Sequence, residues 1–234
     1  MWTALSHVLK KFIQYLHEGI LLEKIHDRLC EYRYRTNFFV FYIYCILRGK
    51  YENLKGLDFS QPMQGIYNVA DNRCDYWPSE KKYVYQALRK INFNNTLNFL
   101  DIGCGKGYVL YLAMKYPFQK ICGIEYSQDI FNILKNNIRK LSSNNVFIFN
   151  IDARDFLAYG EYDVIYFFNP FGREIMKDVM RAITCQMLKN KVYTIIYYNP
   201  VCDDIIRENG IFHLKYELPI SRGKKIYIYE GSRN

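Results

Sequence analysis

The sequence lacks the features of disulfide-rich and zinc-binding proteins. Its seven cysteines are widely scattered with no C-x-x-C pair, and its four histidines show no metal-ligand spacing. This pattern favours reduced thiols in a cytoplasmic protein, and it predicts no metal site. The N-terminus also lacks the basic, then apolar, then small-residue order of a secretory signal peptide.

A long apolar run is missing as well. The most apolar segment, residues 38–47, is flanked by arginines and lysines. It is too short to cross a bilayer, because a transmembrane helix needs about 20 apolar residues. Two interpretations stay open, a buried packing helix and a peripheral membrane contact through residues 36–50.

Charge of one sign is nowhere concentrated. The net charge is +9, but there is no long run of like charges and no aromatic–basic recognition motif. A generally basic surface is therefore favoured over dedicated nucleic-acid binding. Nucleic acid remains an open alternative as a partner.

What the sequence does have is a large apolar fraction, 50% of its residues. Helical periodicity in residues 1–50 and loop chemistry in residues 51–78 predict an N-terminal helical appendage, residues 1–58, before a main domain at 59–234. Ser79 is the candidate N-cap of the first helix in that domain.

Strand and helix patterns alternate through the rest of the chain. Strands are predicted at 97–102, 120–125, 146–150, 163–168, 191–198, 211–217 and 225–230. Helices are predicted at 107–116, 127–141 and 173–189, with shorter ones near 153–158 and 201–208. The first five strands are continuous apolar runs, which predicts an α/β, doubly wound parallel sheet with helices on both faces.

The most informative motif follows the first of these strands and reads Asp101-Ile-Gly103-Cys104-Gly105-Lys106-Gly107. A glycine turn between a strand and a helix brings backbone N–H groups and the positive helix end close to a ligand. The dinucleotide fingerprint is G-x-G-x-x-G, and Tyr108 stands where its final glycine would be. A nicotinamide-dependent oxidoreductase is therefore disfavoured. Lys106 is expected to be a solvated loop residue.

This acid-x-Gly-x-Gly-x-Gly form resembles motif I of class I S-adenosylmethionine (SAM) methyltransferases. The resemblance covers about residues 76–230. It includes the last two strands, which resemble the antiparallel hairpin that ends the seven-stranded, Rossmann-like sheet of that family. It implies SAM as the cofactor, with Asp101 near its methionine part. The implied loop residues are Gly103, Cys104, Gly105 and Gly107.

Two acids follow the next two strands. Glu125 ends the second strand, where a carboxylate can accept hydrogen bonds from both ribose hydroxyls of a nucleoside. Tyr126 either packs against the adenine or simply begins the next helix. After the third strand, the resemblance implies that Asp152 accepts from the adenine amino group and that the Ala153 N–H donates to the ring. A helix N-cap is the structural alternative for Asp152.

The segment Asn169-Pro170-Phe171 ends the fourth strand. It resembles the Asn/Asp-Pro-Pro-aromatic motif of amino methyltransferases, with one proline missing. In those enzymes the amide oxygen and a proline carbonyl accept hydrogen bonds from the target NH₂, which orients its lone pair. Asn169, Pro170 and Phe171 are therefore the candidate catalytic residues. The alternative is a turn without substrate contact.

These residues together predict a SAM-dependent methyltransferase that works by direct SN2 transfer. The favoured acceptor is a nitrogen of a protein or small molecule. The alternative is a noncatalytic module with the SAM fold that contacts nucleic acid or a membrane surface. Tyr76 and Trp77 are expected either to be aromatic walls of the SAM site or to pack in the core.

Overall fold

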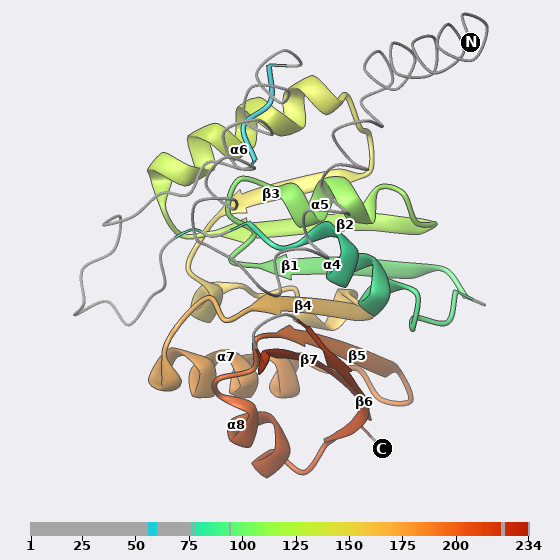
Figure 1. The fold of residues 1–234 in the computed structure, drawn as a ribbon. Coiled ribbons are helices and arrows are strands. Elements are labelled where there is room, and N and C mark those ends of the chain that lie inside the picture. The colour runs from blue at the N-terminus through green and yellow to red at the C-terminus, as the bar shows by residue number, and fades with distance from the viewer. Residues whose placement is uncertain (1–55, 60–75, 77, 94, 221–222, 234) are drawn as a thin grey trace, which may run out of the picture. The chain divides into compact units, whose positions relative to one another are not determined.

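The computed structural model describes residues 56–59, 76, 78–93, 95–220 and 223–233 (Figure 1). The chain divides into two compact units, Met1–Gln61 and Pro62–Asn234, and nearly all described residues belong to the second. Most of the predicted appendage, the segment 36–50 and Trp77 lie outside the described residues, so the boundary at 58/59 and the membrane contact stay predictions. Among the described helices, none has the length and apolar character to cross a bilayer.

Seven strands form one mixed sheet in the order β3-β2-β1-β4-β5-β7-β6. Strands β1 to β5 run parallel, while β7 is antiparallel to both β5 and β6. The predicted fold class is thereby confirmed, including the antiparallel final pair. The strands are β1 (Leu97–Ile102), β2 (Phe118–Glu125), β3 (Val146–Asn150), β4 (Val164–Phe168), β5 (Val192–Tyr198), β6 (Phe212–Pro219) and β7 (Lys225–Ser232).

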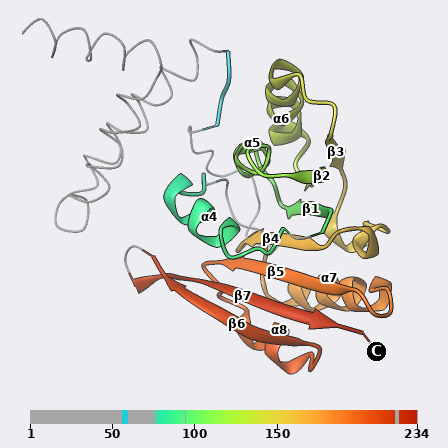
Figure 2. The ribbon, with the colours of Figure 1, turned by 90° about the vertical axis from the view of Figure 1, so that its right-hand side faces the viewer.

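Helices cover both faces of the sheet (Figure 2). One face carries α4 (Lys81–Leu88), α5 (Tyr108–Ala113) and α6 (Gln128–Leu141). The other carries α7 (Arg173–Gln186), α8 (Asp203–Glu208) and two short 3₁₀ turns, η2 (Ala153–Asp155) and η3 (Tyr159–Glu161). On this second face, apolar side chains of the central strands are buried against α7 and α8. Burial on both faces explains why the central strands have long runs of apolar residues instead of an alternation of apolar and polar ones.

One local prediction, the N-cap at Ser79, was wrong, and one strand differs from its central neighbours. β3 is the edge strand of the sheet, and its Phe147 and Phe149 side chains are 44% and 46% exposed. An apolar run alone does not distinguish an edge strand from a central one. Ser79 does not cap α4: Glu80 occupies the N-cap position. The Ser79 hydroxyl instead bonds the Tyr166 hydroxyl of β4 at 3.1 Å.

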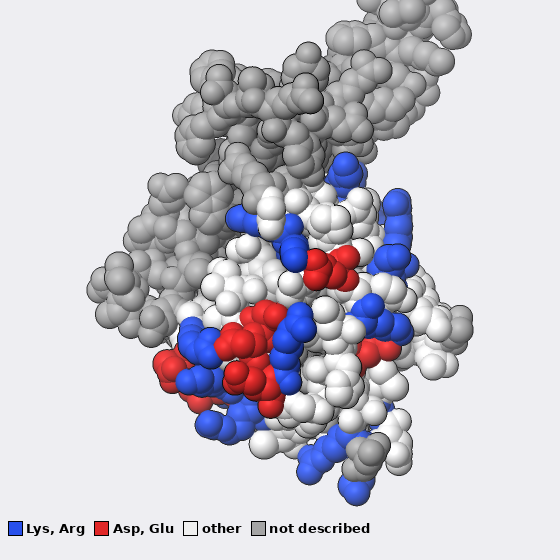
Figure 3. Space-filling view, turned by 60° about the horizontal axis from the view of Figure 1, so that its bottom comes forward, with Lys and Arg blue, Asp and Glu red and all other residues white. Residues whose placement is uncertain are grey.

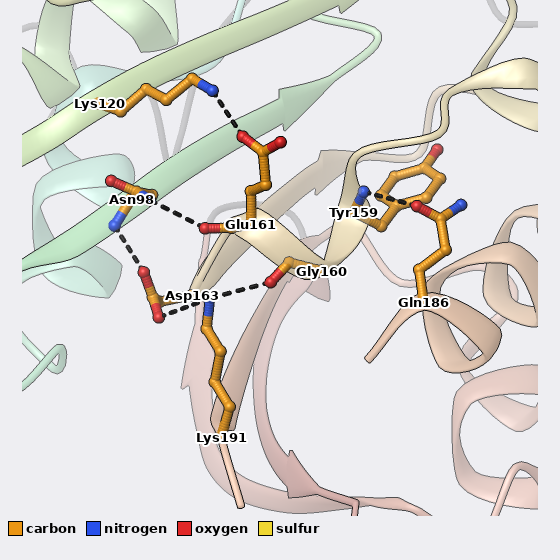
Figure 4. Close-up of polar contacts among 8 residues, drawn as sticks. All are labelled: Asn98, Lys120, Tyr159, Gly160, Glu161, Asp163, Gln186 and Lys191. Atoms are coloured by element: carbon orange, nitrogen blue, oxygen red, sulfur yellow. Dashed lines mark hydrogen bonds and ion pairs between the residues drawn. The ribbon is translucent and has the colours of Figure 1, made fainter. Parts of the chain in front are cut away.

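The strands are fastened together where they begin (Figure 4). The Asp163 carboxylate accepts from the Asn98 backbone N–H at 2.7 Å and pairs with Lys191 at 3.0 Å. The Asn98 side chain donates to the Glu161 carbonyl at 2.9 Å, and Lys120 pairs with the Glu161 carboxylate at 2.7 Å. We call these five residues the amino-edge clamp. They join β1, β2, β4 and β5 at the edge opposite the carboxyl ends of the parallel strands.

The sheet has a topological switch point between β1 and β4. The chain passes from β1 outward to β2 and β3, then returns to β4 on the other side of β1. In doubly wound sheets the crevice beyond the carboxyl ends of the strands at such a point is the usual ligand site.

Candidate active site

A cavity with an empty volume of about 840 Å³, open mouth included, lies at this switch point. Every predicted site residue except Gly107 lines it. The lining set is Asp101, Gly103, Cys104, Gly105, Glu125, Tyr126, Asp152, Ala153, Asn169, Pro170 and Phe171. Tyr76 lines it as well, as expected for an aromatic wall.

The backbone of the glycine turn is bonded to the protein itself. The Gly103 and Cys104 N–H groups both donate to the Ile124 carbonyl, at 2.9 and 3.0 Å. The Gly105 N–H donates to the Glu125 carboxylate at 3.0 Å, and the Gly107 N–H to the Cys104 carbonyl at 2.9 Å. Three of these donors are thus engaged by the end of β2 and the fourth within the turn. The arrangement suits a ligand without a phosphate.

The glycines are needed for backbone shape and space. Gly105 has φ +55°, and a Cβ there would lie 2.3 Å from the ring of Tyr76. Gly107, at φ +87°, is the N-cap of α5, and a Cβ there would lie 2.5 Å from Leu134. An L side chain at either position would be strained and would clash. Gly107 therefore serves the packing of the turn against α6, away from the cavity.

Asp101 is the buried acid of the site, 2% exposed. Among the described residues, its Oδ2 atom has no hydrogen-bond partner. Burial, and then the nearby Glu125 carboxylate, raise the pKa of Asp101 well above its ordinary value. An unpaired buried oxygen beside a cavity is costly unless a ligand supplies a donor. Burial also raises the pKa of the Cys104 thiol, which keeps it neutral rather than nucleophilic.

Glu125 ends β2 as predicted and is 4% exposed. Its Oε2 accepts from Gly105 N–H at 3.0 Å, and its Oε1 accepts from Ser127 N–H at 2.8 Å. The carboxylate thus joins the glycine turn to the start of α6. A carboxylate has about four acceptor sites, so two bonds do not exhaust its capacity.

Asp152 is a helix N-cap, the structural role that the sequence offered as an alternative to adenine binding. It is the N-cap of η2: its Oδ1 accepts from Arg154 N–H at 2.9 Å. Both carboxylate oxygens also bond the Arg154 guanidinium, at 3.1 and 2.9 Å. The side chain still lines the cavity, so capping and a ligand contact are compatible. Tyr126 lines the cavity too and is 49% exposed, as a rim residue would be.

The turn after β4 faces the glycine turn. Asn169 adopts φ 40°, a left-handed conformation that asparagine tolerates better than most residues. A Cβ on Gly103 would lie 2.7 Å from Pro170 Cβ, so the two turns are in contact. Phe171 is 6% exposed and lies edge-on to Phe167, with ring centroids 6.3 Å apart. The three candidate catalytic residues and the predicted cofactor residues thus share one cavity.

Sequence reasoning missed three residues of this region. Tyr166 and Ser79 line the cavity as a buried hydroxyl pair, and Tyr166 is the register neighbour of Asp101. Lys106 was expected in solvent, but it is 1% exposed, with its Nζ 5.4 Å from the centroid of the Tyr76 ring. In the sequence, the pairing of Ser79 with Tyr166 is indicated only by the polar hydroxyl groups that these residues place beside apolar ones.

This strand order, with a glycine turn and strand-end acids around one cavity, defines a class I SAM-dependent methyltransferase. Residues 93–225 match the family described as Methyltransferase domain. The match covers more than half of the chain, which therefore belongs to that family.

Solved structures of the same fold include methyltransferases of several kinds. A ribosomal protein L11 methylase from Lactobacillus delbrueckii subsp. bulgaricus matches with a TM-score of 0.55 at 14% identity, covering 76% of this chain and 84% of that one. The glycopeptide N-methyltransferase MtfA complexed with SAM matches with a TM-score of 0.55 at 8% identity, covering 68% and 97%. At these identities the likeness establishes the fold.

Two sequence relatives carry the name ribosomal RNA small subunit methyltransferase G. The one from Aster yellows witches'-broom phytoplasma (strain AYWB) is 28% identical over 150 residues, 62% of this chain and 65% of the relative. The one from Malacoplasma penetrans (strain HF-2) is 33% identical over 96 residues, 38% of each. The chain spans less than two thirds of the length of either relative.

The residues around the cavity fit SAM. The unpaired Asp101 oxygen suits a cationic amine such as the ammonium of the methionine part. Carboxylates at Glu125 and Asp152 suit the hydroxyl and amino donors of a nucleoside. The remaining lining is largely apolar and aromatic, as small-molecule sites usually are.

Proposed function

We propose that this enzyme transfers the SAM methyl group to a nitrogen atom of ribosomal RNA. In this proposal Asp101, Glu125, Asp152 and the glycine turn hold SAM, and Asn169-Pro170-Phe171 receives the acceptor. The observation that carries the proposal is the contact between the two turns, where Pro170 lies directly against Gly103. An acceptor held at Asn169 would thus be next to the cofactor.

In this proposal the turn Asn169-Pro170-Phe171 orients the atom that receives the methyl group. When bound, SAM supplies a methyl group that its sulfonium charge has already activated. The Asn169 amide oxygen and the Pro170 carbonyl accept hydrogen bonds from the acceptor nitrogen, which aligns its lone pair with the methyl carbon. The new N–C bond forms as the S–C bond breaks, its electron pair stays on sulfur, and the surplus nitrogen proton leaves to solvent. A strong base is not required.

RNA replaces the acceptor class that sequence reasoning favoured, a protein or small molecule. The support is that both sequence relatives are named as small-subunit ribosomal RNA methyltransferases. The net charge of +9 suits a polyanion. On the face drawn in Figure 3, however, basic and acidic side chains are interspersed. The described residues on that face form no continuous basic patch, so charge is a secondary argument.

Labelled methyl transfer tests the proposal. The purified full chain is incubated with methyl-labelled SAM and unmodified small-subunit ribosomal RNA from the source organism, transcribed in vitro or assembled into subunits. Protein and small-molecule fractions of the same cells serve as competing acceptors. We expect nuclease-sensitive label in the RNA, on a base nitrogen.

Asn169→Ala separates the acceptor site from the cofactor site. We expect it to bind S-adenosylhomocysteine, the reaction product, like the wild type and to lose methyl transfer. Label confined to protein or metabolites would contradict the RNA acceptor, and undiminished turnover by Asn169→Ala would contradict the role of Asn169.

A further inference from the structure

We propose that Tyr197 is a positioning residue, which holds the Asn169 side-chain amide in the orientation that receives the acceptor. The inference rests on the acceptor role proposed above for Asn169. Tyr197 lies on β5, beside β4, and is 1% exposed. Its hydroxyl group reaches Asn169 in the turn that follows β4, although Tyr197 and Asn169 are far apart in the sequence.

The hydrogen bonds of the Tyr197 hydroxyl indicate which atom of the Asn169 amide faces it. The oxygen accepts from the backbone N–H of Cys202, the N-cap residue of α8, at 3.2 Å. The same oxygen lies 3.5 Å from Asn169 Oδ1. In the second contact the Tyr197 hydroxyl is the donor, and the Cys202 thiol also hydrogen-bonds this hydroxyl. The amide oxygen of Asn169, rather than its NH₂ group, is therefore the atom that faces Tyr197.

The Asn169 amide needs such a partner. The terminal torsion of an asparagine side chain is broad, so its own rotamer preference does not fix which way the oxygen points. The left-handed backbone at φ 40° sets the direction of the Cα–Cβ bond but not that torsion. An amide oxygen has two acceptor sites, one for the Tyr197 proton and one for an acceptor N–H.

The separation of 3.5 Å is long for an O–H···O bond. Catalytic hydrogen bonds are often long in free enzymes and shorten in the complex with substrate. Tyr197 is held by the Cys202 N–H and packs against Phe167 with ring centroids 5.8 Å apart. The partner that adjusts is therefore Asn169, and its amide turns into place when the acceptor arrives.

The same strand provides a matched control. Tyr193 is 0% exposed, and its hydroxyl also accepts from a backbone N–H, that of Leu188, at 2.9 Å. It donates to the Gly160 carbonyl at 3.0 Å. Tyr193→Phe thus removes an equally buried hydroxyl from the same strand, at the opposite end from the cavity.

The experiment compares Tyr197→Phe with Tyr193→Phe in the full chain. For Tyr197→Phe we expect kcat for methyl transfer to fall about tenfold, the effect of one lost positioning hydrogen bond. Its affinity for S-adenosylhomocysteine, measured by calorimetry, should stay at the wild-type value. For Tyr193→Phe we expect a lower Tm with unchanged kcat. In the Asn169→Ala background, Tyr197→Phe should not lower the residual rate of methyl transfer any further, as followed in single turnovers at high enzyme concentration, because Tyr197 acts through Asn169.

A second measurement does not depend on the acceptor. In protein labelled with ¹⁵N at asparagine, the Asn169 side-chain NH₂ signal should move in Tyr197→Phe and stay in place in Tyr193→Phe. An unmoved signal, an equal kcat loss in Tyr193→Phe, or an additive loss with Asn169→Ala overturns the positioning role. Full turnover by Asn169→Ala alone instead contradicts the proposed function, and the positioning role falls with it.

Discussion

At the scale of single residues, Asp101 shows how this site trades stability for binding. A carboxylate whose pKa is raised in the folded protein binds its proton more tightly there than in the unfolded chain. Between the unfolded and the raised folded pKa, the free energy of unfolding therefore falls as pH rises. At neutral pH Asp101 therefore costs stability, and the Coulomb repulsion with Glu125 contributes to that cost.

We predict that Asp101→Asn raises the Tm of the free protein at neutral pH, because it removes a carboxyl group whose ionisation burial and Glu125 oppose in the folded state. The gain should shrink as pH falls toward the ordinary pKa of an aspartate, since the wild-type carboxyl is then protonated. The same variant should bind S-adenosylhomocysteine about ten- to a hundredfold more weakly, the effect of losing one charged hydrogen bond. Thermal melts across pH and calorimetry check both effects. A lower Tm at every pH would mean that the carboxylate stabilises the free fold.

The same scale shows what sequence can predict of a site. Glu125, Asp152 and Asn169 were found because each stands at the end of an apolar strand, where topology alone brings the ends together. Ser79, Tyr166 and Tyr197 were not found, because their contacts cross the sheet between residues distant in sequence. The environment of Lys106 was predicted wrongly, since a lysine in a glycine turn has no local signal of burial.

At the scale of elements, the apolar pattern predicted the strands and helices well. The boundaries of β1 and β3 agree with the prediction, and the other elements differ by a few residues at their ends. Fraying and tight final turns account for such differences, because propensity changes little across a helix end. What the pattern did not contain is strand order. Phe147 and Phe149 look like core residues in sequence and become edge residues only once β3 ends the sheet.

The amino-edge clamp is an element-scale device whose two ion pairs differ in exposure. The Asp163 side chain is 17% exposed, and the Glu161 side chain is 56% exposed. We predict that Asp163→Ala lowers the free energy of unfolding by about 1–3 kcal/mol, because it leaves the Asn98 N–H without its acceptor and Lys191 with only the Gly160 carbonyl. Glu161→Ala should cost less than about 1 kcal/mol, as exposed pairs usually do.

Urea unfolding of both variants measures this difference, and S-adenosylhomocysteine affinity should be unchanged in each. Equal costs for the two substitutions would show that the clamp does not depend on burial. A weakened ligand affinity in Asp163→Ala would show that the two edges of the sheet are coupled.

At the scale of the whole molecule, ligand binding should stabilise the fold in a selective way. At a concentration 100-fold above its Kd, a ligand stabilises by about 2.7 kcal/mol, which shifts the Tm by roughly 5–10 °C in a domain of this size. We predict such a shift with S-adenosylhomocysteine and none with NADH. The variant Glu125→Gln, which keeps the shape of the side chain, should lose most of the Tm shift with S-adenosylhomocysteine.

Differential scanning fluorimetry checks this selectivity, with calorimetry of SAM and its product as the control. An NADH shift equal to that of S-adenosylhomocysteine would contradict the selectivity expected from the glycine spacing. Absence of both a shift and a heat of binding with SAM and its product would contradict the assignment of the cavity as the SAM site.

The clamp also bears on how this family diversifies. Side-chain bonds hold the starts of four strands in place, whereas the turns at their other ends meet the ligand. Substitutions in those turns can therefore change the methyl acceptor without loosening the register of the sheet. Selection for a different methyl acceptor therefore does not conflict with selection for a stable fold. A single sheet can in this way persist through lineages whose methylated products have nothing in common.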